Sequence, residues 1–182
     1  KEADVQGALG YHATTNKGAP VGFVFTDISD QLGEPWSVTL SHEALELISD
    51  PLCNVLAIGP HPKHKARAVA YWYEMCDAVQ SERYQIGAVW VSNFVTPTYF
   101  TVQDEGRQTN GMGTSLASFG IRPGGYVGFY DPVLGQDDTF MPRGDKVARK
   151  RLAIKSGLGA LRRGNRYKSL GVNSFPGWKL GL

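Results

Sequence analysis

Most apolar residues of this chain fall in short runs separated by turn-forming residues, a pattern that predicts several short strands. Near the N-terminus, apolar runs at residues 9–11 and 21–25 flank a segment that contains Asn16, Gly18 and Pro20. These three residue types are common in tight turns, so the two runs predict a pair of strands joined by a turn. Residues 54–58 have similar apolar character and predict a further short strand.

One segment, residues 37–50, has clear helical character. Its apolar residues recur at helical spacing, at Leu40, Ala44, Leu45, Leu47 and Ile48. Ser37 or Ser41 is suited to cap the start, and Asp50-Pro51 predicts the end because proline disfavours helical geometry in the residue before it. The polar stretch before this helix, residues 27–35, contains glycine and proline and predicts a loop.

The middle of the chain has the strongest strand composition. Residues 66–79 are rich in tyrosine and tryptophan and fit either a buried strand or a helix, because continuous apolar character does not separate the two. A strand is favoured, since residues 84–95 are strongly beta in composition and would form its hairpin partner. Residues 98–102 predict another strand, whereas residues 106–120 and 123–132 are rich in turn-forming residues and predict irregular segments.

Together these elements predict an α+β fold, a small and mostly antiparallel twisted sheet packed on the helix. With 182 residues, 42% of them hydrophobic, the chain is long enough for one core but short for two. No run approaches the roughly 18–20 apolar residues of a membrane span, so no membrane partner is expected. Cys53 and Cys76 lack the spacing of a zinc ribbon, and buried free thiols are favoured over a single disulfide.

Charge is divided unevenly along the chain. Residues 1–142 contain 8 Lys and Arg against 16 Asp and Glu, whereas residues 143–182 contain 11 Lys and Arg and a single acidic residue. This division predicts an acidic domain at residues 1–142 with a basic C-terminal tail or docking arm at residues 143–182. Apolar residues lie among the tail's charges, at Leu152, Ile154, Leu158, Leu161, Leu170, Phe175, Trp178 and Leu180.

This tail is expected to pack on a partner protein or on a second copy of the chain, because apolar residues among charges are typical of binding segments. Nucleic acid is the alternative partner of such a basic segment. A solvated tail that only aids solubility is the third interpretation of residues 143–182.

The predicted helix carries the residues with the clearest chemistry. His42 and Glu46 lie four residues apart and therefore on one face, and Asp50 lies one turn further along it. Glu43 is offset by about 100° around the helix axis and stays within reach of anything that His42 holds. In the HExxH helix of zinc peptidases, two histidines at this spacing bind zinc and the glutamate after the first is the general base.

Glu46 stands where that motif has its second histidine. A carboxylate is an acceptable zinc ligand, but the change makes calcium, manganese or no metal more plausible. A capped and solvated helix face remains the alternative interpretation of the same residues.

A wider pattern surrounds the helix. Ser41-His42-Glu43-x-x-Glu46-x-x-x-Asp50-Pro51 is followed, some twenty residues later, by Trp72-Tyr73-Glu74-x-x-Asp77. The combination resembles a family of zincin-type metallopeptidase-like proteins, which includes bacterial secreted proteins and the plant phosphate-induced, EXORDIUM-like proteins. The resemblance covers about residues 10–77, with weaker support to residue 100, and does not extend into the tail.

The resemblance implies a zincin-like domain and roles for particular residues. His42 and Glu46 would be metal ligands on the helix, and Asp77 or Glu74 would complete the ligand set, with zinc as the expected cofactor. Glu43 would be the catalytic general base. Asp50 would orient a ligand or close the helix end, as carboxylates near metal-bound histidines often do.

The remaining histidines favour simpler roles. His12 could approach the site from an adjacent strand, although a lone histidine at a strand end is more often only hydrogen bonded. His61 and His64 flank Pro62-Lys63 in a predicted exposed loop, and a linker is favoured there over a metal site.

Two functions follow from these observations. The first is a metal-dependent hydrolase, most simply a peptidase that acts on a peptide or protein substrate. The second is a structural or assembly protein, for example a virion component, built on a zincin-like core with a degenerate site and docking through its basic tail. Secreted and virion-associated locations both fit these functions, and the sequence does not choose between them.

Overall fold

The computed structural model describes residues 9–15, 17–102 and 106–142. The predicted tail at residues 143–182 lies outside the described residues, so its separation from residues 1–142 and its partners stay predictions. In chain order the elements are β1 (Gly10–Thr14), β2 (Pro20–Val24), α1 (Thr26–Leu32), α2 (Trp36–Ser49), β3 (Leu56–Pro60), β4 (Ala68–Trp72), η1 (Asp77–Val79), β5 (Arg83–Ile86), β6 (Val89–Ser92), η2 (Pro97–Phe100), β7 (Val127–Asp131) and β8 (Gln136–Phe140).

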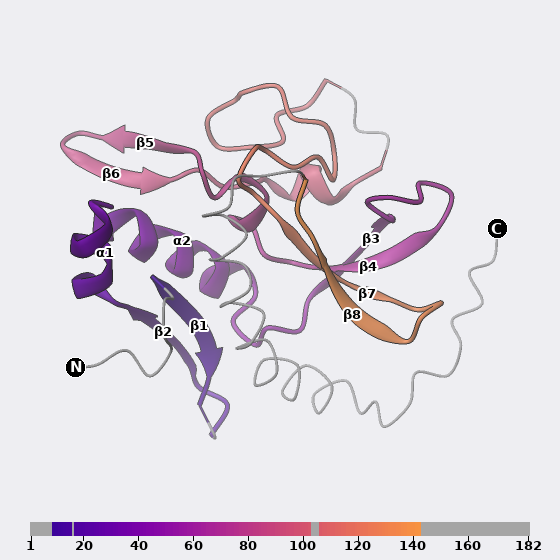
Figure 1. The fold of residues 1–182 in the computed structure, drawn as a ribbon, viewed down its shortest axis with the longest axis horizontal. Coiled ribbons are helices and arrows are strands. Elements are labelled where there is room, and N and C mark those ends of the chain that lie inside the picture. Colours follow the sequence, from indigo (N-terminus) through magenta and orange to yellow (C-terminus); the bar gives the residue numbers. More distant parts are fainter. Residues whose placement is uncertain (1–8, 16, 103–105, 143–182) are drawn as a thin grey trace.

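The described strands form three antiparallel sheets. The largest has the order β3-β4-β7-β8, and the hairpins β1-β2 and β5-β6 form two-stranded sheets. Figure 1 shows the four-stranded sheet on one side of the molecule and the two hairpins, with both helices, on the other. This arrangement confirms the predicted α+β class with antiparallel pairing.

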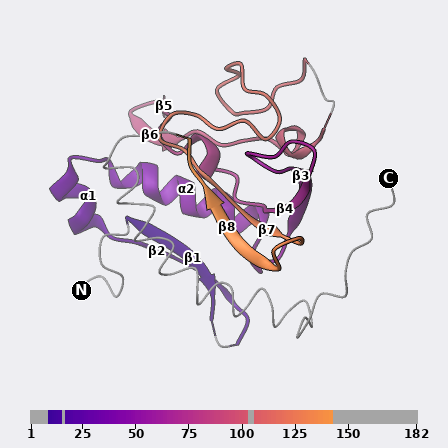
Figure 2. The ribbon, with the colours of Figure 1, turned by 45° about the vertical axis from the view of Figure 1, so that its right-hand side comes forward.

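Helix α2 lies between the two hairpins, as Figure 2 shows, and contacts β1, β2 and β6. Ser37 Oγ donates a hydrogen bond of 2.7 Å to the Trp90 carbonyl, and Ser41 Oγ accepts one of 2.8 Å from the Ser92 amide. Both serines therefore attach β6 to the helix. The predicted serine cap is wrong, because Pro35 occupies the N-cap position and makes no side-chain cap.

The hydrophobic core is built around the four-stranded sheet. Its buried residues come mainly from β4, η1, β7 and the segments near η2, and they are Val69, Tyr71, Ala78, Val79, Val95, Tyr99, Phe119, Val127 and Phe129. Their packing holds β4 and η1 in place, and therefore also the short segment that joins them, residues 73–76. Cys53 and Cys76 are buried thiols that form no disulfide, as predicted.

A close approach at Gly10 brings β1 onto α2. A Cβ atom at this position would lie 2.7 Å from the Phe23 carbonyl oxygen, 2.7 Å from Thr39 Cγ2 and 3.1 Å from Glu43 Cγ. Carbon atoms do not pack at such distances, so only glycine lets the strand lie this near to the helix. The paired strand has a glycine without this constraint, because a Cβ at Gly22 would meet only Leu47 Cδ1, at 3.8 Å.

The predicted loop at residues 27–35 is wrong for most of its length, because α1 covers Thr26–Leu32. The helix ends at Gly33, which adopts a left-handed conformation with φ of 63°. Ser29 is buried, and its Oγ donates to the Phe25 carbonyl at 3.2 Å. A seven-residue helix has too few apolar positions to show a helical period, which is why the sequence pattern missed it.

The predicted hairpin between residues 66–79 and 84–95 is also wrong. Strand β4 pairs with β3 and β7, whereas β5 and β6 pair with each other. Residues 98–102 contain η2 instead of a strand, and residues 123–132 contain β7 within their turn-rich composition. Strand composition indicates which segments are extended, but it does not determine which strands pair with each other in a sheet.

The predicted exposed linker at His61 is wrong as well, because His61 is buried. Its Nδ1 accepts hydrogen bonds from the backbone amides of Lys63 and His64 at 3.0 and 3.1 Å. Its Nε2 lies 3.8 Å from a carboxylate oxygen of Asp131, which also accepts a hydrogen bond from Arg67. His61 therefore holds the turn between β3 and β4 against β7.

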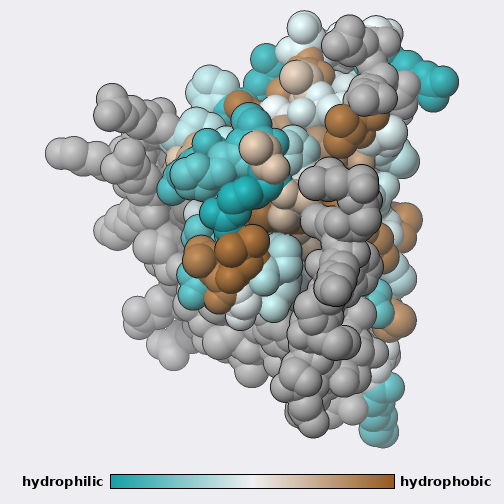
Figure 3. Space-filling view, turned by 90° about the vertical axis from the view of Figure 1, so that its right-hand side faces the viewer, coloured by the Kyte–Doolittle hydropathy of each residue, from teal (hydrophilic) through white to brown (hydrophobic). Residues whose placement is uncertain are grey.

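Several apolar side chains remain exposed, including Ile48, Ile86 and Val133. On the face shown in Figure 3, hydrophobic and hydrophilic residues lie next to each other. Scattered apolar residues of this kind are normal on protein surfaces and indicate no particular function. None of the helices within the described residues is long and apolar enough to cross a membrane.

The contact at Gly10 generates a prediction about stability. Gly10→Ala should lower the free energy of unfolding by about 1–3 kcal/mol, because the added methyl group forces β1 away from α2. Gly22→Ala is the matched control in the same hairpin and should be neutral or slightly stabilising. Urea unfolding of both variants measures the difference, and equal stability of the two would show that β1 does not pack on α2 at Gly10.

Candidate metal centre

Helix α2 buries its charged side and exposes much of its apolar side. The buried residues are Thr39, His42, Glu43 and Glu46, whereas Leu40 is 47% exposed and Ile48 is 74% exposed. A surface helix normally packs its apolar stripe against the protein. The buried face of α2 therefore serves a different purpose from filling a hydrophobic core.

The first group of converging side chains contains His42, Glu46 and Asp77. His42 Nε2 lies 3.3 Å from Glu46 Oε1 and 3.4 Å from Asp77 Oδ1. One donor atom from each of the three residues lies within 4.8 Å of the other two, and all three residues are buried. The distances suit a small cation placed between the donors.

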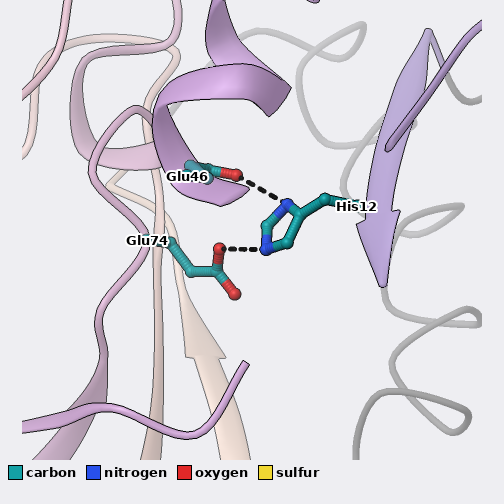
Figure 4. A group of neighbouring side chains, drawn as sticks. All are labelled: His12, Glu46 and Glu74. Carbon is teal, nitrogen blue, oxygen red and sulfur yellow. Dashed lines mark ion pairs between the residues drawn. The ribbon is translucent and has the colours of Figure 1, made fainter. Parts of the chain in front are cut away.

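The second group contains His12, Glu46 and Glu74, which Figure 4 shows facing one another. His12 Nδ1 lies 3.4 Å from Glu46 Oε2, and His12 Nε2 lies 3.5 Å from Glu74 Oε2. One donor atom from each of these three residues also lies within 4.8 Å of the other two, so Glu46 belongs to both groups. Its two oxygen atoms face different histidines, with Oε1 toward His42 and Oε2 toward His12.

Glu43 belongs to the same cluster through His12. Its Oε2 and His12 Nδ1 form a hydrogen bond of 3.1 Å, buried between β1 and α2. Sequence spacing placed Glu43 within reach of anything that His42 holds, and its carboxylate contacts a histidine 31 positions away in the sequence. Glu43 thus lies between the helix and the strand that Gly10 brings close.

Three elements position the ligand-type side chains. β1 carries His12, α2 carries His42, Glu43 and Glu46, and the segment from β4 to η1 carries Glu74 and Asp77. That segment is fixed by its backbone, because the Cys76 amide donates to Glu46 Oε1 at 3.1 Å.

Neighbouring backbone contacts hold the same segment from its other side. The Val95 amide donates to the Met75 carbonyl at 2.7 Å, and the Tyr126 amide donates to the Asp77 carbonyl at 3.1 Å. The carboxylates therefore lie on a supported backbone rather than on a free loop.

Burial and charge shift the pKa values of the cluster. Burial alone would lower the pKa of His12, but Glu74, with Cys53, Glu43 and Glu46, raises it to about 11. Burial raises the pKa of the Glu46 carboxyl, although His42 beside it acts in the opposite direction. Burial also raises the pKa of the Cys76 thiol, next to Glu46.

The donor chemistry fits a divalent cation. Four carboxyl groups lie close to the imidazoles of His12 and His42, three of them buried (Glu43, Glu46 and Asp77) and one partly buried (Glu74). With all four ionised, even two imidazolium ions would leave excess negative charge, and unbalanced buried charge is costly. Imidazole nitrogen with carboxylate oxygen is a ligand set that zinc accepts, and its oxygen content also suits manganese.

The structure thus brings together every residue that the sequence proposed as a ligand, and it adds His12. Either Asp77 or Glu74 was expected near His42, and Asp77 lies there, whereas Glu74 lies beside His12. Asp50 lies at the helix end, where its carboxylate accepts hydrogen bonds from the amides of residues 54 and 55 at 2.9 Å each. This agrees with the predicted closing of the helix end.

His12 is the residue that sequence reasoning undervalued. A lone histidine at a strand end is more often only hydrogen bonded, yet His12 is 1% exposed and contacts three of the four carboxylates. The available signal was Gly10, two residues earlier, because a glycine in a strand can mark a close backbone approach.

Comparisons with protein-family models, with curated proteins and with solved structures gave no match for this chain. The resemblance to zincin-type proteins therefore stays a prediction from the sequence motif.

The raised pKa of His12 generates a prediction about pH. In metal-free protein, His12 binds a proton in the folded state up to about pH 11 but loses it above its usual pKa of 6.5 when unfolded. Its contribution to stability is therefore complete below pH 6.5 and is lost as pH rises toward 11. Between pH 6.5 and 8, below the ordinary pKa of 9.0 at which the Cys76 thiol ionises in the unfolded chain, stability should fall more steeply in wild type than in His12→Gln.

Chemical unfolding across that range, with a chelator present, measures the two slopes. One proton difference corresponds to about 1.4 kcal/mol per pH unit. Parallel slopes in the two proteins would mean that His12 is not protonated in the folded, metal-free state.

Proposed function

We propose that this protein is a metal-dependent hydrolase with peptidase-like chemistry. The observation that carries the proposal is that α2 buries His42, Glu43 and Glu46 together and that Asp77 approaches from a separate segment. A helix gains nothing from burying these groups unless something balances their charge. A cation held by His42, Glu46 and Asp77 is the simplest such group.

The choice of metal follows from the donor set. Imidazole nitrogen and carboxylate oxygen are both zinc ligands, and a catalytic zinc combines three protein ligands with a position open for water or substrate. Zinc is therefore proposed first, with manganese or calcium favoured if the site prefers oxygen ligands. When bound, the cation would polarise a substrate carbonyl group and lower the pKa of a water molecule.

The protein's own residues would supply the remaining chemistry. Glu43 is proposed as the general base that takes a proton from the attacking water, because it follows His42 directly on the helix and lies in the same buried cluster. Its hydrogen bond with His12 fixes the carboxylate in one orientation. A carboxylate has several lone pairs, so this contact leaves capacity to accept a proton.

The substrate class rests on the motif. His42-Glu43-x-x-Glu46 resembles the active-site helix of zinc peptidases, and peptide bonds are therefore the proposed target. The alternative, an assembly protein with a degenerate site and a docking tail at residues 143–182, predicts the same fold without metal binding.

Two substitutions separate the proposed roles. Glu43→Gln should keep the metal at His42, Glu46 and Asp77 but lower peptide hydrolysis by roughly 100-fold to 10,000-fold, because it removes the base and not a ligand. His42→Ala should lose both metal and hydrolysis. Metal analysis after dialysis and a peptidase assay with and without chelator provide the two readouts.

Glu34→Gln is a suitable control, since this carboxylate follows the end of α1 and forms an ion pair with Arg83. Folding of each variant is checked by circular dichroism. Wild-type protein that binds no metal and hydrolyses no peptide would support the assembly function instead.

A further inference from the structure

We infer that the centre holds two metal ions, with Glu46 as the bridging ligand between them. This inference deepens the proposed function and rests on it, because it adds a second ion beside the one assigned to His42, Glu46 and Asp77. The second ion would be held by His12, Glu46 and Glu74.

The geometry of Glu46 is the main argument. Its Oε1 lies 3.3 Å from His42 Nε2, whereas its Oε2 lies 3.4 Å from His12 Nδ1. A carboxylate that bridges two metals offers one oxygen to each. Glu46 is 1% exposed, so its two oxygens are directed by the protein and not by solvent.

Each side of Glu46 has a matching pair of further donors. His42 and Asp77 stand on one side, and His12 and Glu74 stand on the other. Each position thus has one imidazole and one terminal carboxylate, plus one oxygen of the shared glutamate. Two ions with equivalent ligand sets are the arrangement found in two-metal hydrolases, where they stabilise both the attacking and the leaving oxygen.

The state of the His12 ring supports the second position independently. Its Nδ1 is engaged by Glu43 at 3.1 Å, whereas its Nε2 is buried and makes no hydrogen bond with any described residue. Buried polar atoms are normally satisfied, so an unsatisfied imidazole nitrogen facing a carboxylate at 3.5 Å is suited to a metal. With Nε2 as the ligand, Glu43 would hold Nδ1, as a carboxylate commonly holds the other nitrogen of a metal-bound histidine. Glu46 Oε2, which lies 3.4 Å from Nδ1, would then turn toward the ion beside Glu74.

The charge of the centre also changes with the second ion. The centre has four carboxylates, which carry four negative charges when all are ionised: Glu43, Glu46, Glu74 and Asp77. With both imidazoles neutral, one divalent cation would leave half of this negative charge unbalanced. Two divalent cations balance four carboxylates while both imidazoles remain neutral, which is the form in which histidine binds metal. The second ion therefore accounts for Glu74, which a single-metal site does not use.

The test is the number of ions bound per chain. Wild-type full-length protein is dialysed against Zn²⁺ alone and analysed by mass spectrometry of the metal, and two ions per chain are expected. Glu74→Gln should bind one ion, because it removes a ligand of the second position only. Asp77→Asn should also bind one ion, and Glu34→Gln, the remote control, should bind two.

A spectroscopic measurement on the wild-type protein tests the inference without requiring that any variant folds. With Mn²⁺ alone, two ions that share Glu46 should be magnetically coupled, and their electron paramagnetic resonance spectrum should differ from that of isolated Mn²⁺. The coupling is expected because ions in two-metal sites lie roughly 3.5–4 Å apart. An uncoupled spectrum at full loading would overturn the shared ligand.

The outcomes separate this inference from the proposed function. One ion per wild-type chain, with peptide hydrolysis, would overturn the second position and leave the proposed function intact. No bound ion would overturn both. If folded Glu74→Gln binds two ions, Glu74 is not a ligand of the second ion. If it binds none, Glu74 does not belong to the second position alone. Either count would overturn the inference.

Discussion

The burial of acidic and imidazole side chains between α2, β1 and the segment before η1 is the constraint on which this structure depends. Glu46 and His12 are each 1% exposed, and they lie among Glu43, Glu74, His42 and Asp77. Moving several charges out of water costs several kcal/mol per ion unless partners compensate. The raised pKa of Glu46 expresses this cost, whereas the raised pKa of His12 expresses the attraction of the neighbouring carboxylates for its proton, and a bound cation would relieve the remaining cost.

The rest of the described fold holds these groups in place. The apolar core around β4 and β7 fixes the segment that carries Glu74 and Asp77, and Gly10 lets β1 bring His12 against α2. The hairpin β5-β6 is attached to the N-terminal half of α2 through Ser37 and Ser41. Each of these elements thus carries a ligand-type side chain or supports an element that does. The hydrophobic core stabilises the fold at a distance from the charged cluster.

Local patterns in the sequence predicted α2 and the β1-β2 hairpin, because a helical period and a turn composition are encoded in neighbouring residues. They did not predict the partners of β4 or the place of His12, because these depend on contacts between distant segments. His42 and Glu46 follow from helical spacing, whereas Asp77 and Glu74 came from the motif alone. The separation of these two acids onto different histidines is visible only once β1 is packed on α2.

The central claim is that a divalent cation stabilises this buried cluster, and the free energy of unfolding as a function of Zn²⁺ concentration tests it most directly. A ligand that binds only the folded state stabilises it progressively once its concentration exceeds the dissociation constant. The account predicts that unfolding at neutral pH shifts to higher urea with added Zn²⁺, by about 1.4 kcal/mol per tenfold concentration and bound ion. Stability that is unchanged or lowered by Zn²⁺, Mn²⁺ and Ca²⁺ would contradict it.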